Sequence, residues 1–146
     1  MKYYLAYGSN LNKAQMAMRC PDAKPLFSVA LRDKTLVFRG NGNGCGVATV
    51  EPKEGSVVPS AVWEISDKDE AALDRYEGFP HLYRKETVWL SIAEGSVSTQ
   101  AMMYVMNPGR PEASPSDSYY ETIRQGYKDF DLNVRMLELF AKKGVH

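Results

Sequence analysis

Histidine and cysteine are scarce in this chain. Its 146 residues include two of each, His81 and His146, and Cys20 and Cys45. A zinc site usually takes three or four such ligands at close spacing, so we expect no metal site, and no other pattern calls for a cofactor. The two cysteines lie far apart in the sequence and are expected to be reduced thiols, with a single disulfide between them as the alternative.

An excess of charge of either sign is also missing. Lysine plus arginine and aspartate plus glutamate both number 18, so the formal net charge is zero. Binding to nucleic acid or to an anionic membrane depends on clustered positive charge, so we expect neither as a partner. No apolar run approaches the length of a membrane span, and the N-terminus has a strand pattern without signal-peptide features. We therefore predict a cytoplasmic location, while nothing in the sequence indicates an oligomeric state.

The length and pattern predict a single α+β domain spanning residues 1–146. Short stretches typical of strands outnumber helical ones, and most are joined by brief turns. This order favours a mixed or antiparallel sheet, curled into a small β-barrel with flanking helices, over a doubly wound α/β fold, in which helices alternate with strands. The predicted strands are 3–7, 27–31, 35–38, 47–50, 57–65, 83–93 and 97–106, and the predicted helices are 12–19, 66–77, 118–126 and 132–143.

The first informative stretch runs from an aromatic strand into a Gly-Ser-Asn turn at residues 8–10. Gly8 allows a bend where a side chain would clash, and Asn10 is a candidate N-cap for the next helix. Exposed N–H groups at such a corner can bind a carboxylate or a phosphate. An ordinary strand-to-helix turn has the same pattern, so this stretch alone leaves both interpretations open.

The second stretch is a glutamate at the end of a predicted helix. Ser66 and Asp69 form a capping box at its start, and Gly78 follows Glu77 as the C-terminal stop. The carbonyl end of a helix carries partial negative charge, so a carboxylate there is disfavoured, and burial beside Tyr76 and Phe79 would raise its pKa further. Glu77 is therefore a candidate for proton transfer, with a solvated glutamate at a frayed helix end as the alternative.

Together these stretches resemble the gamma-glutamylcyclotransferase family. The matching residues are Tyr7-Gly8-Ser9-Asn10-Leu11 and Leu73-Asp74-x-x-Glu77-Gly78. A third match, Pro115-Ser116-x-x-Tyr119, is followed by Ile123 and Gly126. The resemblance covers nearly the whole chain in order. It implies the small barrel of mixed strands with flanking helices that the pattern favours.

The resemblance also implies a reaction and its residues. The α-amine of a γ-glutamyl group attacks its own γ-carbonyl, releasing 5-oxoproline and a free amine or amino acid without a cofactor. Glu77 would be the single acid/base of this reaction. The family implies as substrate-binding residues Tyr4, Leu5, Ala6, Tyr7, Gly8, Ser9, Asn10, Tyr83 and Tyr119.

Several features of the sequence bear on functions other than this one. A non-enzymatic binding or regulatory module with the same γ-glutamyl or carboxylate pocket is the main alternative. Ser9 lacks a nucleophile elbow, which argues against a serine hydrolase. The glycine-rich run 40–46 lacks the Gly-Lys-Ser/Thr ending of a P-loop and is typical of a hairpin loop. Asn10 stands where relatives acting on glutathione or γ-glutamyl-amines usually carry leucine, which favours γ-glutamyl amino acids, with other γ-glutamyl amides open.

Overall fold

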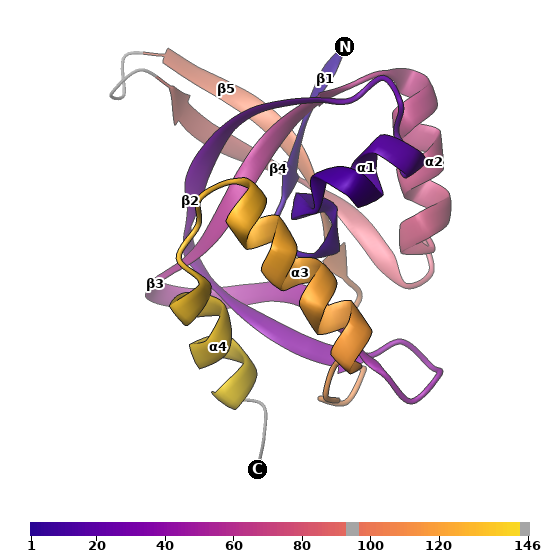
Figure 1. Cartoon of the computed structure of the whole chain (residues 1–146), viewed down its shortest axis with the longest axis vertical. Helices are drawn as coiled ribbons and strands as arrows, with labels where there is room; N and C mark the ends of the chain where they lie inside the picture. Colours follow the sequence, from indigo (N-terminus) through magenta and orange to yellow (C-terminus); the bar gives the residue numbers. More distant parts are fainter. Residues whose placement is uncertain (93–96, 144–146) are drawn as a thin grey trace.

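A five-stranded mixed sheet forms the centre of the fold (Figure 1). The computed structural model describes residues 1–92 and 97–143. Its strands have the order β2-β3-β1-β5-β4, and only the β1–β5 pair is parallel. In chain order, the elements are β1 (Lys2–Ala6), the 3-10 helix η1 (Ser9–Leu11), α1 (Lys13–Arg19), β2 (Lys24–Gly40), β3 (Gly46–Ile65), α2 (Asp67–Glu77), β4 (Tyr83–Ile92), β5 (Val97–Met106), α3 (Asp117–Asp129) and α4 (Val134–Lys143).

The predicted α+β class with a mixed sheet and flanking helices is confirmed. The short central strand β1 connects two long hairpins, since Tyr4 pairs with Trp63 of β3 on one side and with Met102 of β5 on the other. The sheet is strongly curved but is not hydrogen-bonded into a ring, because β2 and β4 end its strand order. "Barrel" is therefore only a loose description of it. The predicted 83–93/97–106 hairpin is present as β4 and β5, and its turn lies outside the described residues.

The predicted breaks within the first hairpin are wrong. Each of β2 and β3 is one continuous strand, although polar residues and glycine interrupt both sequences. The interruption is absorbed by a register shift between Arg32 and Lys34. There Asp33 and Gly55 both have positive φ, 61° and 81°, and the Asp33 carboxylate accepts the Gly55 N–H at 3.0 Å. A β-bulge therefore replaces the predicted turn, and the strands stay paired around it.

Helix caps follow the predictions only in part. α2 begins with the expected capping box of Ser66 and Asp69 and ends at Gly78, whose φ of 64° is left-handed. α1 is capped by Asn12, which accepts the N–H of Gln15, and not by Asn10. The N-cap of α3 is Ser116, two residues before the expected Ser118. Because Asn12 caps the helix, the Asn10 side chain is available for other partners.

The helix α3 is held close to the turn after β1. A Cβ atom at Gly126 would lie 2.6 Å from the Leu11 Cβ and 2.7 Å from the Asn12 nitrogen, so only glycine permits this contact. Leu11 and Ile123 are fully buried at this contact. The packing places α3 against the turn that follows β1 (Figure 1). Among the described residues, no helix has the length and apolar character that a membrane crossing requires.

Candidate active site

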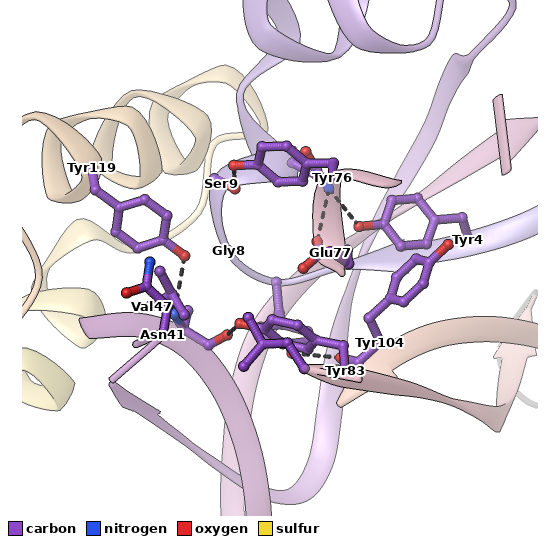
Figure 2. A pocket seen from close by; sticks show the side chains of 14 residues that line it. Tyr4, Gly8, Ser9, Asn41, Val47, Tyr76, Glu77, Tyr83, Tyr104 and Tyr119 are labelled. Atoms are coloured by element: carbon purple, nitrogen blue, oxygen red, sulfur yellow. Dashed lines mark hydrogen bonds between the residues drawn. The ribbon is translucent and has the colours of Figure 1, made fainter. Parts of the chain in front are cut away.

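A cavity of about 280 Å³ lies where the turn after β1 meets the end of α2 (Figure 2). Parts of β1, β3, β4, β5 and α3 complete its walls. Seven of the nine side-chain positions proposed for substrate binding line it, together with Glu77. The complete lining is Tyr4, Tyr7, Gly8, Ser9, Asn10, Asn41, Val47, Ala48, Tyr76, Glu77, Leu82, Tyr83, Tyr104 and Tyr119.

Glu77 is the last residue of α2, and Figure 2 shows its carboxyl group inside the cavity. Loss of hydration raises the pKa of this carboxyl to about 7, and the positive charge of Arg19 opposes part of that rise. At neutral pH the group is thus divided between carboxylate and carboxylic acid. A carboxyl with this pKa can accept a proton and return it at the same pH.

The turn at Gly8 packs tightly against β3. A Cβ atom at Gly8 would lie 3.2 Å from the Ala48 Cβ, which is closer than side chains normally approach. The φ of Gly8 is −127°, so the reason for glycine is this close approach and not a left-handed backbone. The N–H groups of Gly8 and Ser9 donate to no other described residue. Both residues also line the cavity.

Asn10 connects Glu77 to two neighbours. Its Nδ2 atom donates to the Tyr4 hydroxyl at 2.9 Å and lies 3.4 Å from Glu77 Oε1. Its Oδ1 atom accepts a hydrogen bond from Arg19. Next to it, the Ser9 hydroxyl and the Tyr76 hydroxyl are 2.9 Å apart. Hydrogen bonds thus hold the polar side chains of Ser9 and Asn10 in place at the cavity wall.

On the side of the cavity opposite Glu77, two tyrosines form hydrogen bonds with the backbone of Ala48. Tyr119 accepts the Ala48 N–H at 3.0 Å, and Tyr83 donates to the Ala48 carbonyl at 2.6 Å. Tyr7 donates to the Tyr104 carbonyl at 2.6 Å. Burial raises the pKa of the Tyr7, Tyr83 and Tyr119 hydroxyls well above the usual range, so they stay neutral. Within the described chain, no group of three or more His, Cys, Asp or Glu side chains is arranged to hold a metal ion.

The model of the family "Gamma-glutamyl cyclotransferase, AIG2-like" matches residues 4–127. The chain belongs to this family. The match includes the turn at residues 8–10, Glu77 and Tyr119, so the family resemblance inferred from the sequence is confirmed.

Curated relatives and solved structures agree with this membership. The chain is 33% identical over 135 residues to Gamma-glutamylcyclotransferase of Bos taurus, covering 86% of this chain and 70% of that protein. It is 31% identical over 143 residues to the Homo sapiens protein of that name, covering 92% of this chain and 74% of the relative. A solved structure named Gamma-glutamyl cyclotransferase superposes with a TM-score of 0.83 at 27% identity, covering 95% of this chain and 85% of that chain.

In this cyclotransferase fold, two of the residues predicted for the substrate lie elsewhere. Leu5 and Ala6 are buried in the core, and neither lines the cavity. The prediction treated residues 4–10 as one segment, but β1 is a central strand whose residues also serve the core. Tyr4, Tyr7, Gly8, Ser9, Asn10, Tyr83 and Tyr119 are brought together with Glu77.

Several lining residues were missed by sequence reasoning. Tyr76 was considered as an apolar neighbour of Glu77, yet it is 43% exposed and lies at the cavity wall. Its position beside Glu77 was the available signal. Tyr104 comes from the middle of a strand with no polar pattern around it. The remaining missed residues are Asn41, Val47, Ala48 and Leu82.

Proposed function

We propose that this chain is a γ-glutamyl cyclotransferase in which Glu77 is the single acid/base. The family membership and the named relatives support an enzyme and do not favour the alternative of a binding module. The observation that carries the residue assignment is the Glu77 carboxyl in a cavity beside the Gly8–Ser9 turn, with its pKa raised to about 7 by burial.

The proposed reaction is an intramolecular aminolysis. The Glu77 carboxylate accepts a proton from the α-ammonium of the γ-glutamyl group, and the free amine attacks the γ-carbonyl carbon. A carbon–nitrogen bond closes the five-membered ring, and its nitrogen still carries two hydrogens. The γ-amide bond then breaks as protonated Glu77 delivers its proton to the leaving nitrogen, and the regenerated carboxylate takes the second proton from the ring nitrogen and passes it to the departing amine. 5-Oxoproline and an amine or amino acid are released. A carboxyl with a pKa near the working pH is suited to both transfers.

The roles of the other cavity residues follow from the charges that the substrate carries and that develop during the reaction. The N–H groups of Gly8 and Ser9 have no other described acceptor and are proposed to bind the α-carboxylate or the oxyanion. Tyr4, Tyr7, Tyr83 and Tyr119 would enclose the glutamyl chain and hold it curled. Proximity of the amine to the carbonyl then accounts for several kcal/mol of the barrier, on the order of intramolecular reactions in general. Leu5 and Ala6 are left out of this substrate set.

The expected partner is a small γ-glutamyl compound. Asn10 favours γ-glutamyl amino acids over glutathione and γ-glutamyl-amines, because relatives that act on the latter two usually carry leucine at this position. Asn41 brings the loop after β2 to the cavity and would lie on the side of the leaving group. A cytoplasmic location remains the prediction.

The test is product analysis with a matched variant. The purified chain is incubated with γ-glutamyl-alanine, and 5-oxoproline and alanine are measured. Glu77→Gln is expected to keep the fold and to lose turnover by about 100-fold or more, the range for removal of a general acid/base. Glu138→Gln, at an exposed position on α4, is the control and should turn over normally. Undiminished 5-oxoproline release by a folded Glu77→Gln variant would remove Glu77 from this role.

A further inference from the structure

Arg19 lies directly behind the wall of the cavity. It is the last residue of α1, and its guanidinium stacks on the Tyr76 ring, with the Cζ atom 3.5 Å from the ring centroid. Nη1 donates to Asn10 Oδ1, and Nη2 donates to Gln15 Oε1 at 2.9 Å. Arg19 is not one of the residues that line the cavity, and none of the described carboxylates forms a salt bridge with it. Two of its three partners, Asn10 and Tyr76, line the cavity, and none of the three is a carboxylate that would neutralise it.

The hydrogen bond from Arg19 decides which way the Asn10 amide faces. An amide oxygen can only accept, and the amide NH2 can only donate. With Oδ1 bound to the guanidinium, Nδ2 must point to the other side, where it meets the Tyr4 hydroxyl and Glu77 Oε1. The reversed amide would place its oxygen against the Glu77 carboxylate, which is repulsive. A donor facing Glu77 thus depends on Arg19.

The same guanidinium also holds the neighbouring side chain. Stacking of a guanidinium on a tyrosine ring is favourable and fixes the plane of that ring. The Tyr76 hydroxyl is 2.9 Å from the Ser9 hydroxyl, so the position of the ring bears on the turn itself. One side chain therefore braces both residues that follow Gly8.

We propose that Arg19 is a positioning residue for the cyclisation. It orients the Asn10 amide so that its NH2 group holds the Glu77 carboxyl toward the substrate, and it braces Tyr76 against Ser9. This inference rests on the proposed function, because one of its two measurements is turnover. Its structural readout, the ionisation of Glu77, does not need turnover.

Arg19 is also the charge that acts on Glu77. The other titratable groups around this carboxyl are tyrosines from five elements and the segment after β1: Tyr4, Tyr7, Tyr76, Tyr83, Tyr104 and Tyr119. Burial raises the pKa of Tyr4, Tyr7, Tyr83, Tyr104 and Tyr119, so these five contribute no charge at neutral pH. Arg19 favours the carboxylate form of Glu77 and thereby opposes the effect of burial.

Three variants separate positioning from charge. Arg19→Met keeps a long side chain but removes the guanidinium. Arg19→Lys keeps the charge but cannot present the planar pair of donors that reaches both Asn10 and Gln15. Arg75→Met is the matched control, because Arg75 is an exposed arginine two residues from Glu77 and takes part in none of the ion pairs among the described residues.

Two measurements are made on each variant. Turnover of γ-glutamyl-alanine is followed from pH 5 to 9, and the Glu77 carboxyl is titrated by carbon-13 NMR without substrate, assigned by its absence in Glu77→Gln. For Arg19→Met we expect kcat to fall about tenfold or more with KM nearly unchanged, since Arg19 does not line the cavity. We also expect the Glu77 titration to move to higher pH. Arg19→Lys should keep the Glu77 titration near that of the wild type and still lose kcat, and Arg75→Met should change neither.

The outcomes are distinct. A folded Arg19→Met variant with an unmoved Glu77 titration, or an equal shift in Arg75→Met, would overturn the inference. Wild-type kcat in Arg19→Lys would show that charge alone suffices and would exclude positioning. Absence of 5-oxoproline from the wild type would instead contradict the proposed function, while the NMR titration would still decide whether Arg19 controls Glu77.

Discussion

Asn10 and Glu77 are 67 positions apart in the chain, yet Asn10 Nδ2 lies 3.4 Å from Glu77 Oε1. This contact joins the turn after the first strand to the end of α2. The helix end and the loss of hydration both disfavour the carboxylate, whereas the amide donor and Arg19 favour it. This balance leaves the Glu77 pKa at about 7, and the first two predictions depend on it.

The first prediction concerns the pH dependence of turnover. The proposed mechanism starts with Glu77 as a base, so kcat/KM should rise with pH through a limb near the Glu77 pKa of about 7. The measurement is initial rates of 5-oxoproline release from pH 5 to 9 at low substrate concentration. A constant kcat/KM from pH 5 to 8 would exclude a carboxyl of this pKa as the base.

The second prediction concerns stability. The pKa of Glu77 is higher in the folded state, about 7, than its ordinary value of 4.5, so the folded protein binds the proton more tightly than the unfolded chain. Protonated Glu77 therefore stabilises the fold fully below about pH 4.5. This stabilisation, on the order of 1 to 3 kcal/mol, is lost as the pH rises through 7. Urea unfolding of wild type and Glu77→Gln at several pH values measures it. The difference between their free energies of unfolding should change in that window, and parallel curves would contradict the expectation.

The third prediction tests the packing that places α3. Gly126→Ala adds a methyl group that would meet the Leu11 Cβ at 2.6 Å and backbone atoms of residues 11 and 12 at 2.7 Å. Alanine is the better helix former by about 1 kcal/mol, but the clash should outweigh this and lower the free energy of unfolding by about 1 to 3 kcal/mol.

Gly40→Ala is the control for this prediction. Its added methyl group would approach the Pro111 carbonyl oxygen at 3.8 Å, an ordinary contact, and the backbone there has no positive φ. Urea unfolding of both variants should show a clear loss for Gly126→Ala alone. A Gly126→Ala variant more stable than the wild type would mean that α3 can move away from the turn at no cost.

The fourth prediction concerns the cavity wall opposite Glu77. Tyr119→Phe leaves the Ala48 N–H without its acceptor, which costs about 1 to 3 kcal/mol for a buried group. Because Ala48 lines the cavity and packs on Gly8, we expect the KM for γ-glutamyl-alanine to rise as well. Tyr120→Phe is the control, since its hydroxyl is in none of the hydrogen bonds of the described chain. Equal KM values for the two variants would remove Tyr119 from the substrate site.

Local patterns in the sequence were sufficient for several elements. The capping box of Ser66 and Asp69, and the stop at Gly78, predicted both ends of α2 and therefore the place of Glu77 at its last position. The excess of strands predicted the mixed sheet. The polar stretch at Asp33 was misleading, because a bulge and a turn need the same residue types, and only pairing with β3 distinguishes them.

The chain's own residue order thus accounts for α2, its caps and the disfavoured carboxyl at its end, because caps and helix dipoles act within a few residues. Long-range packing was needed to bring Asn10 to Glu77, to place Arg19 behind Asn10, and to separate the core residues Leu5 and Ala6 from the cavity. Such contacts depend on how β1, α1 and α2 meet around the sheet. No pattern over a few neighbouring residues carries that information.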